Sequence, residues 1–177
     1  MVVLIRLLDI AMLNALTGLT HDWIGDWHLI TSIVALVTGT SILTMRKGTR
    51  RHRWVGYAYV GSMTVMLATA FAIYRVFDGF GLFHIFAVVS SLTLTAGMIP
   101  AWRRGPRWLE YHIGFMYWSV MGLYGAFAAE ILARLPGAPF FTTIGLVVAG
   151  VMLLGEVGWR RFGPRWTASW VRQPARA

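Results

Sequence analysis

The sequence predicts an all-α integral membrane protein, a bundle of about five transmembrane helices with a four-helix core built from two similar hairpins. Its 177 residues are 57% apolar, with a mean hydropathy of +0.62. Several mostly apolar stretches reach the length of about 18 residues that is typical of a membrane span. Short turns rich in arginine, glycine or proline separate these stretches. We therefore expect one integral membrane domain over residues 1–177 and no soluble domain.

The N-terminal segment, residues 1–25, is predicted to be amphipathic. Arg6, Asp9 and Asn14 interrupt its apolar residues and fall roughly on one side of a helix. Such a helix lies in the membrane interface or packs against the bundle, and a sixth span over residues 1–19 is the alternative. Because Asp9 interrupts the apolar run and no clear small-residue cleavage site follows, a cleaved signal peptide is not expected.

The four-helix core is expected over residues 27–134, with a fifth span after it and a basic tail over residues 160–177. The expected spans are 27–45, 54–77, 82–102, 109–132 and 140–157. Gly105 and Pro106 break the chain inside the second basic turn. Each hairpin repeats one order: an aromatic residue and a histidine, an apolar span, a basic turn, and a second histidine.

The distribution of charge predicts the orientation in the membrane. Of the 16 lysines and arginines, only Arg6, Arg75 and Arg134 fall outside the two basic turns and the tail. The positive-inside rule then places the N-terminus outside and the C-terminus in the cytoplasm. This arrangement accounts for the net charge of +9 through topology and lipid contact, so we expect no nucleic-acid partner.

Four histidines are the candidate functional residues. His28 and His84 open spans at the predicted outer face, and His52 and His112 open spans at the inner face. Ionisable side chains in apolar spans are costly and therefore indicate function. Facing helices of a bundle commonly hold haem or metal between inward side chains, so we expect one or two haems b with these histidines as ligands of the haem iron. For His52, a solvated place in the basic turn is the alternative.

The chain has no cysteine, which excludes thiolate metal sites and covalent haem attachment through cysteine. Glu130 and Arg134 are four residues apart and can form an interfacial ion pair. The alternative for Glu130 is a proton-handling or ligand-contacting group beside the outer histidines. We predict no catalytic residue.

Short motifs in the core carry a resemblance to a known family. They are Lys47-Gly48, His52-Arg53-x-x-Gly56-x-x-Tyr59, Phe83-His84, His112, Trp118-Ser119-x-x-Gly122-Leu123 and Ala126-Phe127-Ala128-Ala129-Glu130. Over about residues 27–134 the chain resembles the domain-of-unknown-function 2306 family of bacterial multi-pass membrane proteins. The resemblance implies the architecture and a place in the bacterial inner membrane, but no activity.

A looser similarity is to the cytochrome b561 class of two-haem transmembrane cytochromes. It implies that His28 and His84 ligate an outer haem and that His52 and His112 ligate an inner one. A quinol or a soluble donor would supply the electrons. Because His52 sits among arginines, we expect the outer pair, with Glu130 nearby, to be the better site.

The expected function is therefore a transmembrane electron carrier like a b-type cytochrome. Two alternatives stay open. One is a non-redox accessory or binding subunit of a membrane protein complex, and the other is a histidine-ligated metal enzyme that acts on lipid at one membrane face.

Overall fold

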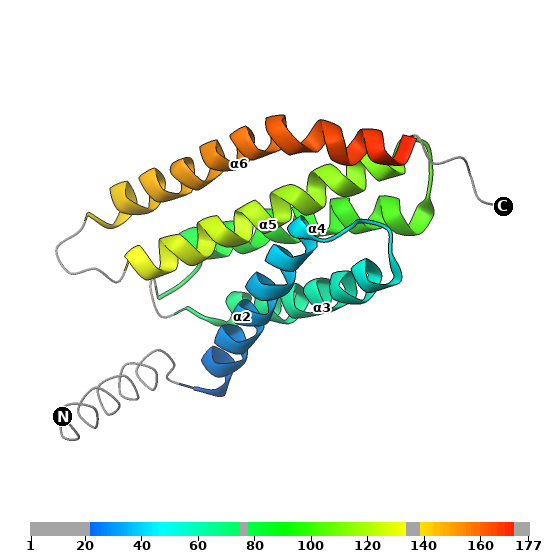
Figure 1. Ribbon diagram of the computed structural model, residues 1–177. Coiled ribbons are helices and arrows are strands. Elements are labelled where there is room, and N and C mark those ends of the chain that lie inside the picture. The colour runs from blue at the N-terminus through cyan, green and yellow to red at the C-terminus, as the bar shows by residue number, and fades with distance from the viewer. Residues whose placement is uncertain (1–21, 75–77, 134–138, 172–177) are drawn as a thin grey trace, which may run out of the picture.

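Five long helices make up the part of the chain that the computed structural model describes, residues 22–74, 78–133 and 139–171 (Figure 1). The helices are α2 Trp23–Thr44, α3 Arg50–Ala72, α4 Leu82–Arg103, α5 Trp108–Leu132 and α6 Phe140–Val171. These ranges contain no strand, so the predicted all-α class is confirmed. The prediction of an amphipathic N-terminal helix lies outside the described residues.

The first four helices form a bundle of two hairpins. α2 packs mainly on α3, and α4 packs mainly on α5, whereas smaller contacts join α3 to α4 and α2 to α5. α2 and α4 are therefore diagonal in the bundle, as are α3 and α5. α6 packs along α5 on the outside of the bundle (Figure 1). Each predicted histidine pair thus joins diagonal helices.

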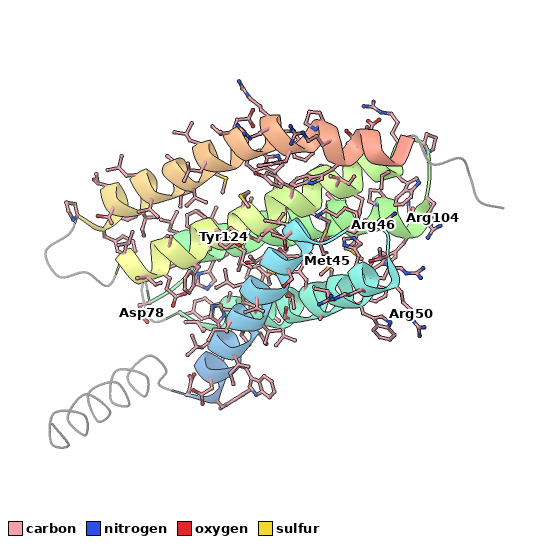
Figure 2. All side chains as sticks on the ribbon, in the orientation of Figure 1. Met45, Arg46, Arg50, Asp78, Arg104 and Tyr124 are labelled. Carbon is pink, nitrogen blue, oxygen red and sulfur yellow. The ribbon has the colours of Figure 1, made fainter. Side chains whose placement is uncertain are left out.

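The two ends of the bundle differ in charge. Arg46, Arg50 and Arg104 lie at one end and Asp78 lies at the other (Figure 2). We call the first the basic end, because it holds both basic turns and the arginines late in α6. Every lysine and arginine among the described residues lies there.

The outside of the bundle is apolar. All five helices are long and apolar enough to cross a membrane. Leu92, Leu146 and Leu154 expose 66%, 71% and 74% of their surface. Such apolar area is unusual on a soluble monomer, whereas lipid is the natural solvent for it. The chain is a multi-pass membrane protein.

The centre of the core is Tyr59, which is fully buried. Its ring packs on Gly39 of α2, where an added Cβ would lie 3.0 Å from Tyr59 Cε2. Its hydroxyl is hydrogen-bonded to Ser119 Oγ on the diagonal helix α5, at 2.8 Å. Tyr59 follows His52 by two helical turns, as Ser119 follows His112. Since α3 and α5 run in the same direction, both histidines lie about 10 Å closer to the basic end.

The helix ends differ from the predicted ones because caps, and not hydropathy, determine them. α2 begins at Trp23 because Asp22 accepts a hydrogen bond from Gly25 N at 2.8 Å. α3 begins at Arg50 because Thr49 Oγ1 accepts one from His52 N at 3.1 Å.

The fifth helix is much longer than the predicted span 140–157. α6 continues through Pro164 to Val171, so the first part of the predicted tail is helical. Proline costs a helix one backbone hydrogen bond, but packing against α5 offsets that loss. Trp159 and Trp166 lie against Tyr117, with ring centroids 5.3 and 5.7 Å apart. This extension brings α6 alongside the first turns of α5.

Candidate functional site

A cavity of about 380 Å³ lies among the ends of all five helices at the basic end. Both His52 and His112 line it. Around them are cationic and aromatic side chains, among them Lys47, Arg53, Arg104, Trp102, Trp108 and Trp166. The volume falls within the range typical of small-molecule sites, about 300–1,000 Å³. The structure thus brings the inner histidine pair together in one cavity.

His112 stands near the start of α5 and is held by the neighbouring helix. Its Nδ1 lies 2.9 Å from the backbone carbonyl oxygen of Gly97 on α4. A carbonyl oxygen only accepts, so Nδ1 carries the proton and donates it. Nε2 then keeps its lone pair. A histidine that ligates a metal typically donates its other ring N–H in this way.

The close approach of α4 and α5 at Gly97 makes this hydrogen bond possible. A Cβ added at Gly97 would lie 2.8 Å from Met116 Sδ and 3.2 Å from Phe115 Cβ. The first distance is shorter than real Cβ contacts and the second is tighter than most of them, so a side chain here requires a shift of a neighbour. Gly97 therefore positions the His112 ring.

His52 occupies the first turn of α3, where Thr49 caps the helix. Its Nδ1 is buried and has no hydrogen-bond partner among the described residues. A buried polar atom without a partner costs roughly 1–3 kcal/mol.

The interior of the cavity is apolar and roomy. Met98, Ile113 and Met116 form part of the lining. Gly56 also lines the cavity, one turn after His52, and a Cβ there would meet no atom within 4 Å. A larger side chain at position 56 would therefore project into open space, which makes this position suitable for filling the cavity.

Lys47 connects the mouth of the cavity to two helices. Its Nζ donates to the carbonyls of Ile42, Leu43 and Met45 at the end of α2, the last two at 2.9 and 3.2 Å. It also lies 5.0 Å from the centroid of the Trp166 ring on α6. Burial lowers the pKa of the Lys47 ammonium. Lys47 therefore caps α2 and binds the end of α6 to it.

His28 lies at the opposite end and is engaged by α3. Its Nδ1 is 3.1 Å from both Met66 O and Thr69 Oγ1. α3 is the neighbour of α2 in its own hairpin, whereas the predicted partner His84 stands on the diagonal helix α4. His28 does not line the cavity at the basic end.

His84 is enclosed by aromatic rings at the start of α4. Tyr74 and Phe80 stack on it with ring centroids 4.7 and 5.0 Å away, and only 3% of its surface is exposed. Its Nδ1 accepts the Gly81 N–H at 3.2 Å. Its Nε2 is buried and has no hydrogen-bond partner among the described residues.

The remaining predicted residues stand apart from the cavity. Glu130 is half-buried near the far end of α5. Arg134, its predicted partner, lies outside the described residues. Across the described ranges, no group of three or more metal-ligating side chains is placed to hold a metal ion. A haem ligated by two histidines does not need such a group.

Sequence reasoning missed the contribution of α6 to the cavity. Trp166 lies in the part predicted to be a tail, and hydropathy carries no signal that this part is helical. The sequence places Lys47 in a basic turn and in the Lys47-Gly48 motif, and neither predicts its contacts. Its role depends on the helix end that it caps.

The chain was compared with protein-family models, curated proteins and solved structures, and none matches. The two family resemblances therefore remain predictions, and the site geometry carries the functional argument.

Proposed function

We propose that the chain is an electron carrier of the b-type cytochrome kind, with a haem ligated by His52 and His112 at the basic end. One observation carries the proposal: both histidines line one cavity between diagonal helices, and the hydrogen bond of His112 Nδ1 to Gly97 O leaves its Nε2 with a lone pair. This reverses our expectation that the outer pair is the better site.

The residues that line the cavity suit a haem. His112 has the tautomer that a haem ligand needs, and His52 lines the same cavity. The apolar lining suits a flat macrocycle, and Arg53 and Arg104 suit its carboxylates. When bound, haem supplies one-electron chemistry, with a potential set by axial ligands and burial.

The chain's own residues prepare the site. The Gly97 carbonyl fixes the ring of His112, and Thr49 fixes the first turn of α3 that carries His52. Trp102, Trp108 and Trp166 supply aromatic rings to the lining of the cavity.

The position of the opening supports a donor dissolved in the membrane, such as a quinol. Tyr57 on α3 and Trp102 on α4 line the cavity and also expose 58% and 65% of their surface. The cavity therefore reaches the outside of the bundle between these two helices.

The test is an absorbance spectrum of detergent-purified protein expressed with added haem precursor. We expect a Soret band and a reduced α-band in the wild type and their loss in His52→Ala and His112→Ala. Gly56→Leu, which fills the cavity without touching a ligand, should also lose haem. Gly61→Leu is the matched control, because Gly61 lies on the same helix, has no atom within 4 Å of an added Cβ and does not line the cavity.

Two results would contradict the proposal. One is a wild-type protein that stays colourless after haem supplementation. The other is a haem spectrum that neither His52→Ala nor His112→Ala changes.

A further inference from the structure

We infer that the protein exchanges electrons at its basic end only, because His28 and His84 do not form a second haem site. This inference rests on the proposed haem at the basic end. The contacts of the two histidines at the opposite end carry it, and they disagree with the two-haem relay that the cytochrome resemblance implies.

The tautomer of His84 opposes ligation of iron. The Gly81 N–H is a donor, so His84 Nδ1 must accept, and the proton of the neutral ring is then on Nε2. A nitrogen that carries a proton has no lone pair for iron. Ligation through Nε2 would move the proton to Nδ1 and place two N–H donors 3.2 Å apart.

The packing of His84 indicates a structural role instead. Tyr74 and Phe80 both stack on the ring with an interplanar angle of 30°, and Phe71 lies 6.5 Å away. With 3% exposure, the ring has no room for a macrocycle beside it. His84 closes the first turn of α4 by accepting the Gly81 N–H, so we assign it as a cap of this helix.

His28 is hydrogen-bonded to α3, its neighbour in the hairpin. Met66 O only accepts, so His28 Nδ1 carries the proton and donates to α3. This leaves the lone pair of His28 on Nε2, as in His112. The pair that a second haem needs is missing because His84 Nε2 carries the proton.

The interior between the two ends is closed. From His112 to Glu130, α5 extends about 27 Å along the bundle. Tyr59, Met63, Val120 and Leu123 fill this space, each no more than 3% exposed. With one haem at the basic end, both the electron donor and the acceptor must be reached at that end.

Haem content tests the inference directly. We expect one haem per chain by the pyridine haemochrome assay, unchanged in His28→Ala and His84→Asn. Asparagine keeps an acceptor for the Gly81 N–H, so this variant should fold. Two haems per chain, or loss of half the haem in either variant, would overturn the inference.

A readout independent of haem separates this inference from the proposed function. ¹⁵N spectra of histidine-labelled protein should show His84 protonated on Nε2, and a proton on Nδ1 would overturn its assignment as a cap. If the wild-type protein holds no haem, the proposed function fails, and the claim about electron exchange fails with it. The assignment of His84 as a helix cap is still tested by its tautomer.

Vesicles test the functional consequence. Protein is reconstituted with ferricyanide trapped inside and dithionite added outside. The trapped ferricyanide should be consumed no faster than in vesicles with His112→Ala. Faster consumption that His84→Asn abolishes would show a relay across the membrane and overturn the inference.

Discussion

The four core histidines differ in what their Nδ1 atoms meet. His112 Nδ1 faces the Gly97 carbonyl and His28 Nδ1 faces the Met66 carbonyl, whereas His84 Nδ1 faces the Gly81 N–H. When Nδ1 donates to a carbonyl, the neutral ring carries its proton on Nδ1 and Nε2 keeps a lone pair. When Nδ1 accepts from an N–H, the proton is on Nε2. The same residue type therefore keeps an Nε2 lone pair in two places and caps a helix in a third.

Gly97 should be sensitive to a single methyl group. In Gly97→Ala the new Cβ would lie 2.8 Å from Met116 Sδ and 3.2 Å from Phe115 Cβ, so Met116 must repack and α4 is pushed slightly from α5, which loosens the hydrogen bond of its carbonyl to His112. We expect a loss of roughly 1–3 kcal/mol in unfolding free energy and weaker haem binding, measured by denaturant unfolding and haem titration. Gly61→Ala is the control, because a Cβ there meets nothing within 4 Å. Equal stability and haem affinity in both variants would contradict this account.

The hydroxyl pair at the centre of the core should show energetic coupling. Tyr59→Phe leaves Ser119 buried without its partner, and Ser119→Ala does the same to Tyr59. Each variant should lose on the order of 1–2 kcal/mol of unfolding free energy, and the double variant should lose less than the sum. Strictly additive losses would mean that the hydrogen bond contributes nothing to the stability of the bundle.

At the scale of helices, the sequence predicted the elements better than their ends. Apolar length and basic turns sufficed for the five spans, the two hairpins and the end of the bundle at which each histidine stands. The ends at Asp22 and Thr49 depend on single side-chain caps, and the extension of α6 depends on its packing against Tyr117. The cavity could not be predicted, since all five helices contribute to it.

The α2 cap at Lys47 predicts a pH dependence of stability. Burial lowers the pKa of this ammonium below the 10.5 of an unfolded lysine. Between the two values the unfolded chain holds the proton and the folded chain does not, so raising the pH through this window stabilises the fold. Lys47→Met removes this pH-dependent contribution to stability together with the hydrogen bonds to α2.

Melting temperatures in detergent between pH 8 and about 10.5 would measure this pH-dependent contribution of Lys47 to stability. The wild type should melt higher than Lys47→Met, and the gap should widen as the pH rises. Arg46→Met, at the neighbouring exposed position, is the control and should show no such widening. A gap that narrows with rising pH would contradict the role given to burial.

At the scale of the whole molecule, charge and site coincide. The end of the bundle that carries every described lysine and arginine also carries the cavity, whereas Asp22, Asp26, Asp78 and Glu130 lie toward the opposite end. Positive charge marks the cytoplasmic side of a membrane protein. The proposed haem would therefore exchange electrons with the cytoplasmic half of the membrane.

Single cysteines can test this orientation, because the chain has none of its own. Asp26→Cys reports on the opposite end, Arg51→Cys on the basic end and Ile33→Cys on the lipid-facing middle of α2, where the native side chain is 50% exposed. In intact cells an impermeant maleimide should label Asp26→Cys alone, and Arg51→Cys should become labelled only after lysis. Ile33→Cys should stay unlabelled in both cases, because a thiol in lipid ionises poorly. Labelling of Arg51→Cys in intact cells would invert the topology and place the site at the outer face.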